Sequence, residues 1–244
     1  MKKSILIQAR LSSSRFPGKV LSNIFDTPIV EFIYNRCSAS SEADITAVVT
    51  SNDKSDDELF DYCMAHRIEV YRGDLRNVLY RYVKAAEFYG SDTICRVCAD
   101  SPFVDVGRID AMFREFKDSQ VDYVFCTPLT FLVGTDAEIV SLNALKESLR
   151  ASSDDEDLEH VTRYIRNNPE RFRTKTIDAG MNLKGFEDMK LTVDYPEDLG
   201  FCRSIAASLK DSTNFDSQDI FEIVLMNRSM LDQKKSDHLV LEDR

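Results

Sequence analysis

Short apolar runs alternate with longer amphipathic stretches along the first half of the chain. Five apolar runs bounded by turn residues predict buried strands, at 5–7, 45–50, 69–71, 93–98 and 122–126. Four stretches between them have apolar residues at helical spacing, at 28–37, 56–67, 77–89 and 108–116. Gly90 is the expected C-cap of the third helix. This regular alternation predicts an α/β fold with a mostly parallel central sheet and helices on both faces.

The rhythm of the pattern changes after residue 127. Further strands are expected at 137–140, 172–177 and 190–193, and further helices at 141–150, 158–167, 196–209 and 217–226. We therefore expect one domain over residues 1–229, in which about 127–188 form a small inserted arm. Residues 230–244 are expected to form a peripheral C-terminal tail.

Composition restricts the class of partner and the compartment. With 244 residues, 43 % of them apolar, the chain is long enough for a substantial core. A net charge of −11 argues against nucleic acid as a main partner. No apolar stretch approaches the roughly 20 residues of a membrane span, and the first residues lack the apolar region of a signal peptide. We therefore expect a cytoplasmic protein with no membrane partner.

The six cysteines are expected to be buried free thiols in that compartment. Cys95 and Cys98 match C-x-x-C within a predicted strand. Residues three apart on a strand point to opposite faces, so neither a shared metal nor a disulfide is expected from this pair.

The loop after the first predicted strand has the composition of a polyphosphate site. Residues 9–19 read A-R-L-S-S-S-R-F-P-G-K and contain three cations, Arg10, Arg15 and Lys19. Arginine offers a bidentate fork, lysine a point charge, and small residues let backbone N–H groups approach a phosphate. The spacing is neither the Walker pattern nor G-x-G-x-x-G. A solvated basic loop without a ligand is the alternative interpretation.

Residues 8–21, Q-A-R-L-S-S-S-R-F-P-G-K-V-L, resemble the nucleotide-binding signature of the SpsF-like (spore coat polysaccharide biosynthesis protein F) cytidylyltransferases, which are related to CMP-Kdo and CMP-sialic acid synthetases. The usual family form is Q-A-R-M-G-S-T-R-L-P-G-K-V-L, so Ser12 replaces a glycine. With the motifs below, the resemblance covers residues 4–205. It implies a Rossmann-like, GT-A-like nucleotidyltransferase fold. It also implies catalytic roles for Arg10 and Lys19 and CTP contacts from Ala9, Arg10, Ser12, Ser13, Arg15 and Lys19.

Two aspartates follow predicted strands and resemble the family's metal-binding positions. Asp100 stands in A-D-S-P-F-V-D-V, similar to G-D-C-P-L-I-D-P, and Asp194 stands in L-T-V-D-Y-P-E-D-L, similar to L-T-V-D-T-P-E-D-L. Such strand ends form the ligand-binding edge of open α/β sheets. The resemblance implies that both carboxylates are catalytic and bind Mg²⁺, the expected cofactor. Helix capping is the alternative for each, and Asp105 is expected to be a helix cap.

Three further segments resemble motifs around the base and the acceptor. Residues 73–82, G-D-L-R-N-V-L-Y-R-Y, are similar to G-x-x-x-D-V-L-D-R-Y, which implies that Asn77 and Arg81 contact the cytidine; Asn77 and Tyr80 stand where the family often has Asp. G-T-D-A-E at 134–138 and E-H-V-T at 159–162 imply acceptor contacts from Asp136, Glu138, Glu159 and His160. A solvated helix position is the alternative for His160. Arg163 and Arg166 are candidates for binding an acceptor anion.

The sequence therefore favours a Mg²⁺-dependent cytidylyltransferase that transfers CMP from CTP to a sugar or sugar acid and releases pyrophosphate, for surface polysaccharide or glycan synthesis. The resemblance also implies a homodimer formed through the segment after the fifth strand. Two alternatives remain open. A GT-A glycosyltransferase is disfavoured because no D-x-D follows the fourth predicted strand. A non-catalytic nucleotide-binding protein would tolerate the departures at Ser12, Asn77 and Tyr80.

Overall fold

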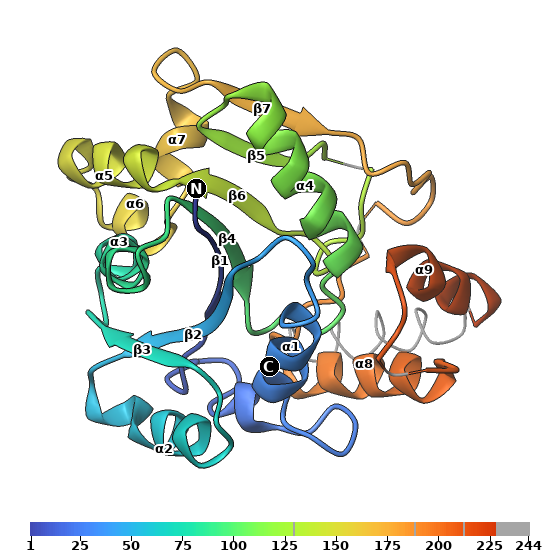
Figure 1. The fold of residues 1–244 in the computed structure, drawn as a ribbon. Helices are drawn as coiled ribbons and strands as arrows, with labels where there is room; N and C mark the ends of the chain where they lie inside the picture. The colour runs from blue at the N-terminus through green and yellow to red at the C-terminus, as the bar shows by residue number, and fades with distance from the viewer. Residues whose placement is uncertain (129, 188, 212, 228–244) are drawn as a thin grey trace.

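One seven-stranded sheet forms the centre of the molecule (Figure 1). The computed structural model describes residues 1–227 apart from 129, 188 and 212, so the tail predicted at 230–244 lies outside the described residues. The strand order is β3-β2-β1-β4-β6-β5-β7, and β6 runs antiparallel to both of its neighbours in an otherwise parallel sheet. The strands are β1 Lys3–Gln8, β2 Ile45–Ser51, β3 Val70–Gly73, β4 Thr93–Cys98, β5 Tyr123–Cys126, β6 Glu138–Ser141 and β7 Thr174–Ile177.

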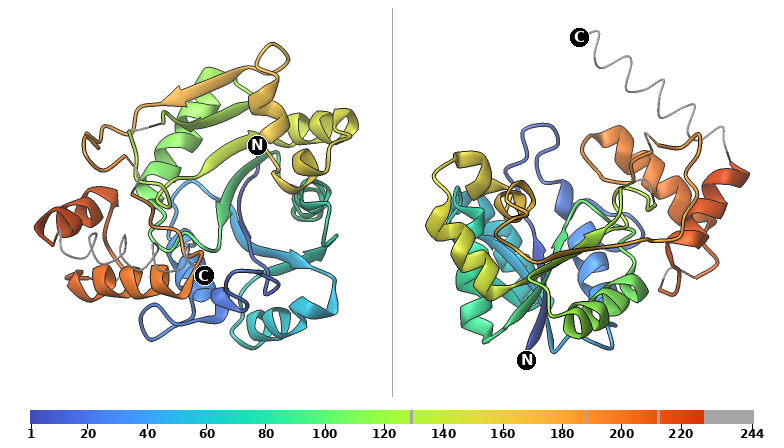
Figure 2. Two further views of the ribbon diagram at one scale, coloured as in Figure 1. Left: turned by 180° about the vertical axis from the view of Figure 1, so that it is seen from behind. Right: turned by 90° about the horizontal axis from the view of Figure 1, so that it is seen from above.

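Helices cover both faces of this sheet, which confirms the predicted α/β class (Figure 1). On one face lie α1 Ile29–Cys37, α2 Asp57–Ala65, α4 Val106–Ser119, α8 Pro196–Ser208 and α9 Ser217–Met226. On the other face lie α3 Val78–Tyr89, α5 Leu142–Ala151, α6 Asp155–Glu159 and α7 Arg163–Asn167. Helices α8 and α9 pack together on the α1 side of the molecule (Figure 2).

The first strand shows why the sheet takes a helical layer on each side. Successive side chains of a strand point to opposite faces. Ile5 and Ile7 therefore enter the core beneath α1 and α4, while Leu6 enters the core beneath α3 and α5. All three side chains are fully buried, as a parallel strand covered on both faces requires.

Local capping follows the sequence closely. The Asn77 side chain accepts a hydrogen bond from the Tyr80 N–H at the start of α3, and Gly90 ends that helix in the left-handed conformation. Asp105 caps α4 by accepting from the Arg108 N–H at 3.0 Å. The expected caps at Gly90 and Asp105 are therefore confirmed. All six cysteines lie outside any disulfide bond, and five of them are buried.

The single helix expected over 158–167 is wrong, because the chain forms α6 and α7 with a break between them. The Thr162 hydroxyl lies 2.9 and 3.0 Å from the two carboxylate oxygens of Glu138, which is buried. This hydrogen bond to a distant residue holds Thr162 at the break. Local periodicity carries no information about such a partner, so the pattern predicted one continuous helix.

The strand expected over 190–193 is also absent from the sheet. Lys190 forms an isolated bridge with Val133, and the Leu191 N–H donates to the Val133 carbonyl at 2.8 Å. The Val193 N–H then donates to the Asp100 carbonyl, also at 2.8 Å. The segment is extended because its N–H groups bond to two other loops, those that contain Val133 and Asp100. The residues predicted as an arm, 127–188, include β6 and β7 of the central sheet.

Among the described residues, none of the helices has both the length and the apolar character needed to cross a bilayer.

Candidate active site

The cationic loop between β1 and the short 3-10 helix η1, Lys19–Leu21, is anchored by a buried carboxylate. Asp56 accepts a hydrogen bond from the Leu11 N–H at 2.7 Å, and its other oxygen accepts from the Ser51 N–H and hydroxyl at the end of β2. The Gly18 N–H donates back to the Leu11 carbonyl at 3.0 Å, which closes the loop. Asp56 was missed by sequence reasoning because its polar turn carries no signal that marks one Asp as buried.

The replacement of glycine by Ser12 imposes no left-handed backbone. Within the described part of the chain, the residues other than glycine with positive φ are Arg67 and Gln120. The serines are therefore compatible with the loop as folded, and Ser13 supports it by accepting from the Phe16 N–H at 3.3 Å. Ala9, at the start of the loop, is buried and donates its N–H to the Val49 carbonyl at 3.2 Å.

Lys19 joins the two aspartates that the sequence singled out. Its Nζ lies 3.0 Å from Asp100 Oδ2 and 3.6 Å from Asp194 Oδ1. The same ammonium donates to the Val193 carbonyl at 2.6 Å, and only 11 % of the side chain is exposed. Both carboxylates keep over a quarter of their side-chain surface exposed, at 29 % and 28 %. The fold therefore brings the carboxylate that follows β4 and the carboxylate that precedes α8 together at a site open to solvent.

Asp194 does not cap the helix that follows it. The residue at the cap position of α8 is Tyr195. The carboxylate of Asp198 accepts from the N–H groups of both Asp194 and Tyr195, at 3.0 and 2.9 Å. Since Asp198 performs the capping, the carboxylate of Asp194 is left to face the cations.

The two arginines of the loop pair with carboxylates from other parts of the chain. Arg15 lies 2.5 Å from Asp194 and 5.3 Å from the centre of the Tyr195 ring. Arg10 lies 3.1 Å from Glu159, which brings the predicted acceptor segment to the edge of the loop. The three cations of the loop are thus matched by three carboxylates, those of Asp100, Glu159 and Asp194.

The two residues predicted to contact the cytidine have structural partners. The Asn77 side-chain oxygen is used as the α3 cap. Arg81 is fully buried, and its Nη1 donates to the Asp74 carbonyl at 2.8 Å, while its Nε and Nη2 have no hydrogen-bond partner among the described residues. Burial lowers the pKa of Arg81. Because the Arg81 side chain is buried, direct contact with a base requires a change of conformation.

The predicted acceptor residues are divided between the interior and the surface. Glu138 is buried and accepts from Tyr123, Thr162, Arg96 and Arg166, so its oxygens are bonded to the chain itself. Burial opposes its ionisation, but the charges of Arg96 and Arg166 prevail and lower the pKa of Glu138. The sequence carried no sign of this network.

The other acceptor candidates lie nearer the surface. Asp136 accepts from the Gly134 N–H at 3.0 Å, and burial raises the pKa of Asp136. His160 is exposed at the end of α6. Arg163 pairs with acidic residues of the α6 segment, and Arg166 pairs with Glu138. Both arginines, predicted as anion ligands, therefore have carboxylate partners within the chain.

The donor set suits a divalent cation that completes its coordination elsewhere. Mg²⁺ prefers carboxylate oxygens and usually keeps waters or phosphate oxygens in its shell. Asp100 and Asp194 provide two such carboxylates around one ammonium. Among the described residues, no cluster of three or more His, Cys, Asp or Glu is arranged to hold a metal. The residues therefore fit a metal shared with a bound phosphate.

A mostly parallel α/β sheet whose carboxyl edge bears a cationic loop and two partly exposed carboxylates is typical of a protein that binds an anionic, phosphate-bearing ligand at that edge. Comparison with known proteins then gives the family. Residues 4–232 match the family model described as cytidylyltransferase, and the chain belongs to this family. It is a nucleotidyltransferase, which decides against the glycosyltransferase and the non-catalytic alternatives.

Individual relatives agree with this assignment. The chain is 30 % identical over 229 residues to the spore coat polysaccharide biosynthesis protein SpsF of Bacillus subtilis, covering 92 % of this chain and 93 % of that one. A 3-deoxy-manno-octulosonate cytidylyltransferase of Hydrogenovibrio crunogenus is 29 % identical over 157 residues, 60 % of each chain. The solved structure of a cytidylyltransferase from Leptospira borgpetersenii superposes with a TM-score of 0.88 at 28 % identity, covering 94 % of this chain and 96 % of that one.

Proposed function

We propose that this protein is a Mg²⁺-dependent enzyme that transfers CMP from CTP to an oxygen of a sugar or sugar acid, with release of pyrophosphate, for surface polysaccharide or glycan synthesis. The observation that carries the proposal is the convergence of Asp100 and Asp194 on Lys19, beside Arg15. The name of the SpsF relative supports the polysaccharide context, and the octulosonate cytidylyltransferases support a sugar-acid acceptor.

The charge balance of the site supports a metal requirement. Arg10, Arg15 and Lys19 each have a carboxylate partner, so the free site has little net positive charge to offer a triphosphate. Asp100 and Asp194 would hold Mg²⁺, which when bound supplies positive charge next to the phosphate oxygens. The arginines can then turn from their carboxylates to the phosphates, where their forked donors match the oxygens.

The residues contribute positioning and charge to the chemical step. The acceptor oxygen bonds to the α-phosphorus and loses its proton to solvent, while the bond from the α-phosphorus to the bridging oxygen breaks and pyrophosphate leaves. Cations beside the β- and γ-phosphates stabilise the charge that develops on the leaving group. Glu159 is placed by Arg10 at the edge of the same loop. Asp136 and His160 are further candidates for binding acceptor hydroxyls.

Thermal stabilisation by nucleotides tests the donor. CTP, UTP, ATP and GTP are each added with and without Mg²⁺ to the wild type and to Asp100→Ala. A ligand that binds only the folded state stabilises it by about 2.7 kcal/mol at a hundred times its Kd. We expect stabilisation by CTP with Mg²⁺ and loss of the Mg²⁺-dependent part in Asp100→Ala. Preference for UTP or a purine nucleotide would disprove the donor, and no response to any nucleotide would disprove the function.

Pyrophosphate release tests the acceptor. A 3-deoxy sugar acid, a sugar phosphate and an amino sugar are each supplied with CTP and Mg²⁺, and release above the rate with CTP alone identifies the acceptor class.

The proposal also includes a cytoplasmic homodimer formed through residues 127–188. Light scattering on the purified protein tests the dimer, and a monomeric mass would exclude it.

A further inference from the structure

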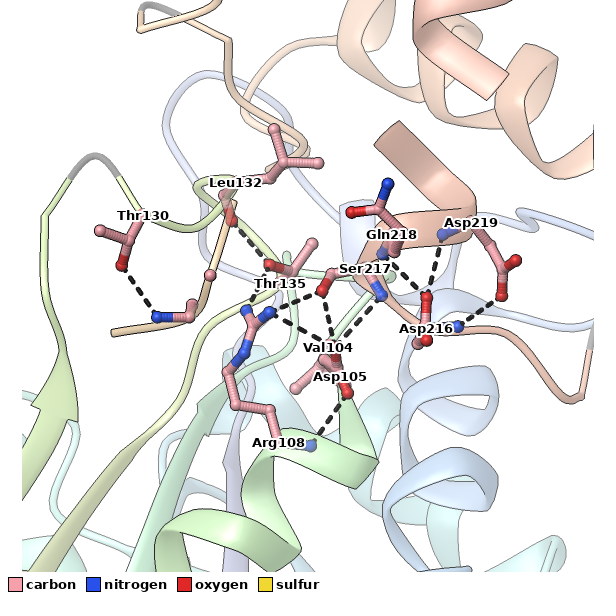
Figure 3. A network of polar contacts seen from close by, with 12 residues as sticks. Val104, Asp105, Arg108, Thr130, Leu132, Thr135, Asp216, Ser217, Gln218 and Asp219 are labelled. Atoms are coloured by element: carbon pink, nitrogen blue, oxygen red, sulfur yellow. Dashed lines mark hydrogen bonds and ion pairs between the residues drawn. The ribbon is translucent and has the colours of Figure 1, made fainter. Parts of the chain in front are cut away.

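A buried polar cluster lies where α4, α9 and the loop before β6 meet (Figure 3). Asp105 and Ser217 are both buried and lie far apart in the sequence. Asp105 Oδ2 accepts from the Ser217 N–H at 3.1 Å and from its hydroxyl at 2.7 Å. The start of α9 is therefore fixed to the start of α4, five residues after Asp100.

Arg108 extends the cluster to a third segment. Its Nη2 donates to the Ser217 hydroxyl at 2.7 Å and lies 3.6 Å from Asp105, while its Nη1 donates to the Thr135 hydroxyl at 3.4 Å. The Asp105 N–H donates to the Thr135 carbonyl at 3.0 Å. Figure 3 shows Arg108 between Ser217 and Thr135, so one guanidinium joins α9 to the loop before β6.

That loop touches the segment that carries Asp194. A side chain at Gly134 would place its Cβ 2.9 Å from the Leu191 carbonyl carbon and from the Thr192 nitrogen, so the two backbones are in close contact. The Leu191 N–H donates to the Val133 carbonyl at 2.8 Å. Beyond it, Val193 is bonded through its N–H to the Asp100 carbonyl and through its carbonyl to Lys19.

Arg36 of α1 makes a second connection between the same regions. Its guanidinium donates to the carbonyls of Val104 at 3.0 Å, Phe215 at 3.2 Å and Thr213 at 3.4 Å. The segment that leads from Asp100 into α4 is thus held to the start of α9 on two sides. A continuous path of contacts leads from Ser217 through Thr135 and Gly134 to Asp194.

We propose that Asp105, Arg108 and Ser217 form a positioning cluster that fixes the backbones carrying Asp100 and Asp194, and so sets the separation of the two carboxylates. The inference rests on the proposed function for its consequence, the metal-dependent binding of CTP. The three residues act as positioning residues through the backbones of the 101–105, 132–136 and 191–194 segments, and we assign them no direct contact with nucleotide or metal.

The matched variants are Ser217→Ala and Asp216→Ala. Ser217→Ala removes the hydroxyl that joins Asp105 to Arg108. Asp216 is the adjacent residue and caps α9, accepting from the N–H groups of Gln218 and Asp219, so Asp216→Ala weakens α9 without touching the cluster. Arg108→Lys is a second test of the cluster, because it keeps the charge but loses the forked donor.

Hydrogen exchange on the free protein tests the positioning itself. We expect Ser217→Ala to accelerate exchange of the Asp105, Thr135 and Val193 amides about tenfold, since each lies on the path. Asp216→Ala should accelerate exchange within α9 alone. The proposal is overturned if the effect of Ser217→Ala is confined to α9, or if Asp216→Ala accelerates the Val193 amide equally.

CTP titrations with and without Mg²⁺ test the consequence. In Ser217→Ala and Arg108→Lys we expect the gain in CTP affinity from Mg²⁺ to fall about tenfold, while the metal-free affinity stays within twofold of the wild type. Equal losses in both conditions indicate general damage and overturn the proposal. If the wild type binds no CTP, the proposed function has failed, and the exchange measurement still decides whether the cluster positions the two aspartates.

Discussion

Asp100 and Asp194 approach the same ammonium, that of Lys19, at 3.0 and 3.6 Å. They lie in separate segments, Asp100 after β4 and Asp194 before α8, and the hydrogen bond from the Val193 N–H to the Asp100 carbonyl holds those segments together. Lys19 thus offsets the repulsion that two adjacent carboxylates would otherwise have in the free protein. In the same geometry, the two carboxylates are also available as ligands for a cation other than lysine, such as a metal ion.

Lys19→Met should therefore make the free protein respond to Mg²⁺ alone. Loss of the ammonium leaves the two carboxylates uncompensated and the Val193 carbonyl without its donor. Lost hydrogen bonds to charged groups cost about 1.5–3 kcal/mol of unfolding free energy. We expect a lower melting temperature, partly restored by millimolar Mg²⁺ that leaves the wild type unaffected.

Lys146→Met is the control for this variant, because Lys146 pairs with Glu87 in a partly exposed ion pair at 2.8 Å. It should show neither the loss nor the Mg²⁺ response. If Mg²⁺ acts equally on the wild type and on Lys19→Met, the carboxylate pair is not the metal site.

Arg15→Ala should weaken CTP binding with little effect on stability. The Arg15 side chain is 53 % exposed, and exposed ion pairs contribute about 0–1 kcal/mol to stability. A charge-assisted contact with a phosphate is worth about 1.5–3 kcal/mol, which corresponds to at least a tenfold change in affinity. Calorimetric titration with CTP and Mg²⁺ measures the loss. Arg114→Ala removes a similarly exposed arginine, paired with Glu42, and should leave CTP affinity unchanged.

Gly134→Ala should damage the site more than the same change at Gly180. Both glycines have positive φ, at 97° and 75°, where a side chain costs about 1–2 kcal/mol. A Cβ at Gly180 meets open space, whereas a Cβ at Gly134 meets the Leu191–Thr192 backbone at 2.9 Å. We expect the denaturant midpoint to fall further in Gly134→Ala, and Mg²⁺-dependent CTP binding to weaken in that variant alone. Equal denaturant midpoints in Gly134→Ala and Gly180→Ala would show that the 191–192 backbone moves away from the added Cβ at no cost in stability.

Glu138→Gln should change how stability depends on acid pH. The folded pKa of Glu138 is lowered, so its contribution is fully present above the unfolded pKa of about 4.3 and is lost as pH falls through the folded pKa. Breaking a buried pair costs about 3–5 kcal/mol, because Arg96 and Arg166 lose their shared partner. The variant should be much less stable at pH 7 and lose less stability below pH 4.3 than the wild type.

Urea denaturation across pH 3–7 measures this difference. Glu58→Gln changes an exposed side chain on α2 and should follow the wild-type profile. If Glu138→Gln runs parallel to the wild type below pH 4.3, Glu138 does not titrate as the buried network requires.

The sequence determined the elements whose causes are local. The first strand, the helices α1 to α5 and the caps at Gly90 and Asp105 follow from apolar spacing and from side chains that bond their own neighbours. It also identified the cationic loop and Asp100, because strand ends in an α/β pattern face one edge, and it identified Asp194 because its motif resembles that of a known family. The sequence could not place Arg81 in the interior, since its exposure depends on how the chain packs above it.

Only the tertiary structure decided which carboxylates meet which cations. Asp194 faces Lys19 and Arg15 because Asp198 takes over the helix cap, and Glu138 is engaged by arginines from β4 and α7. The break at Thr162 and the extended path of 190–193 have the same origin, namely partners distant in the sequence. Local pattern fixes backbone preference, whereas ion pairs and hydrogen bonds between distant segments depend on the three-dimensional path of the chain.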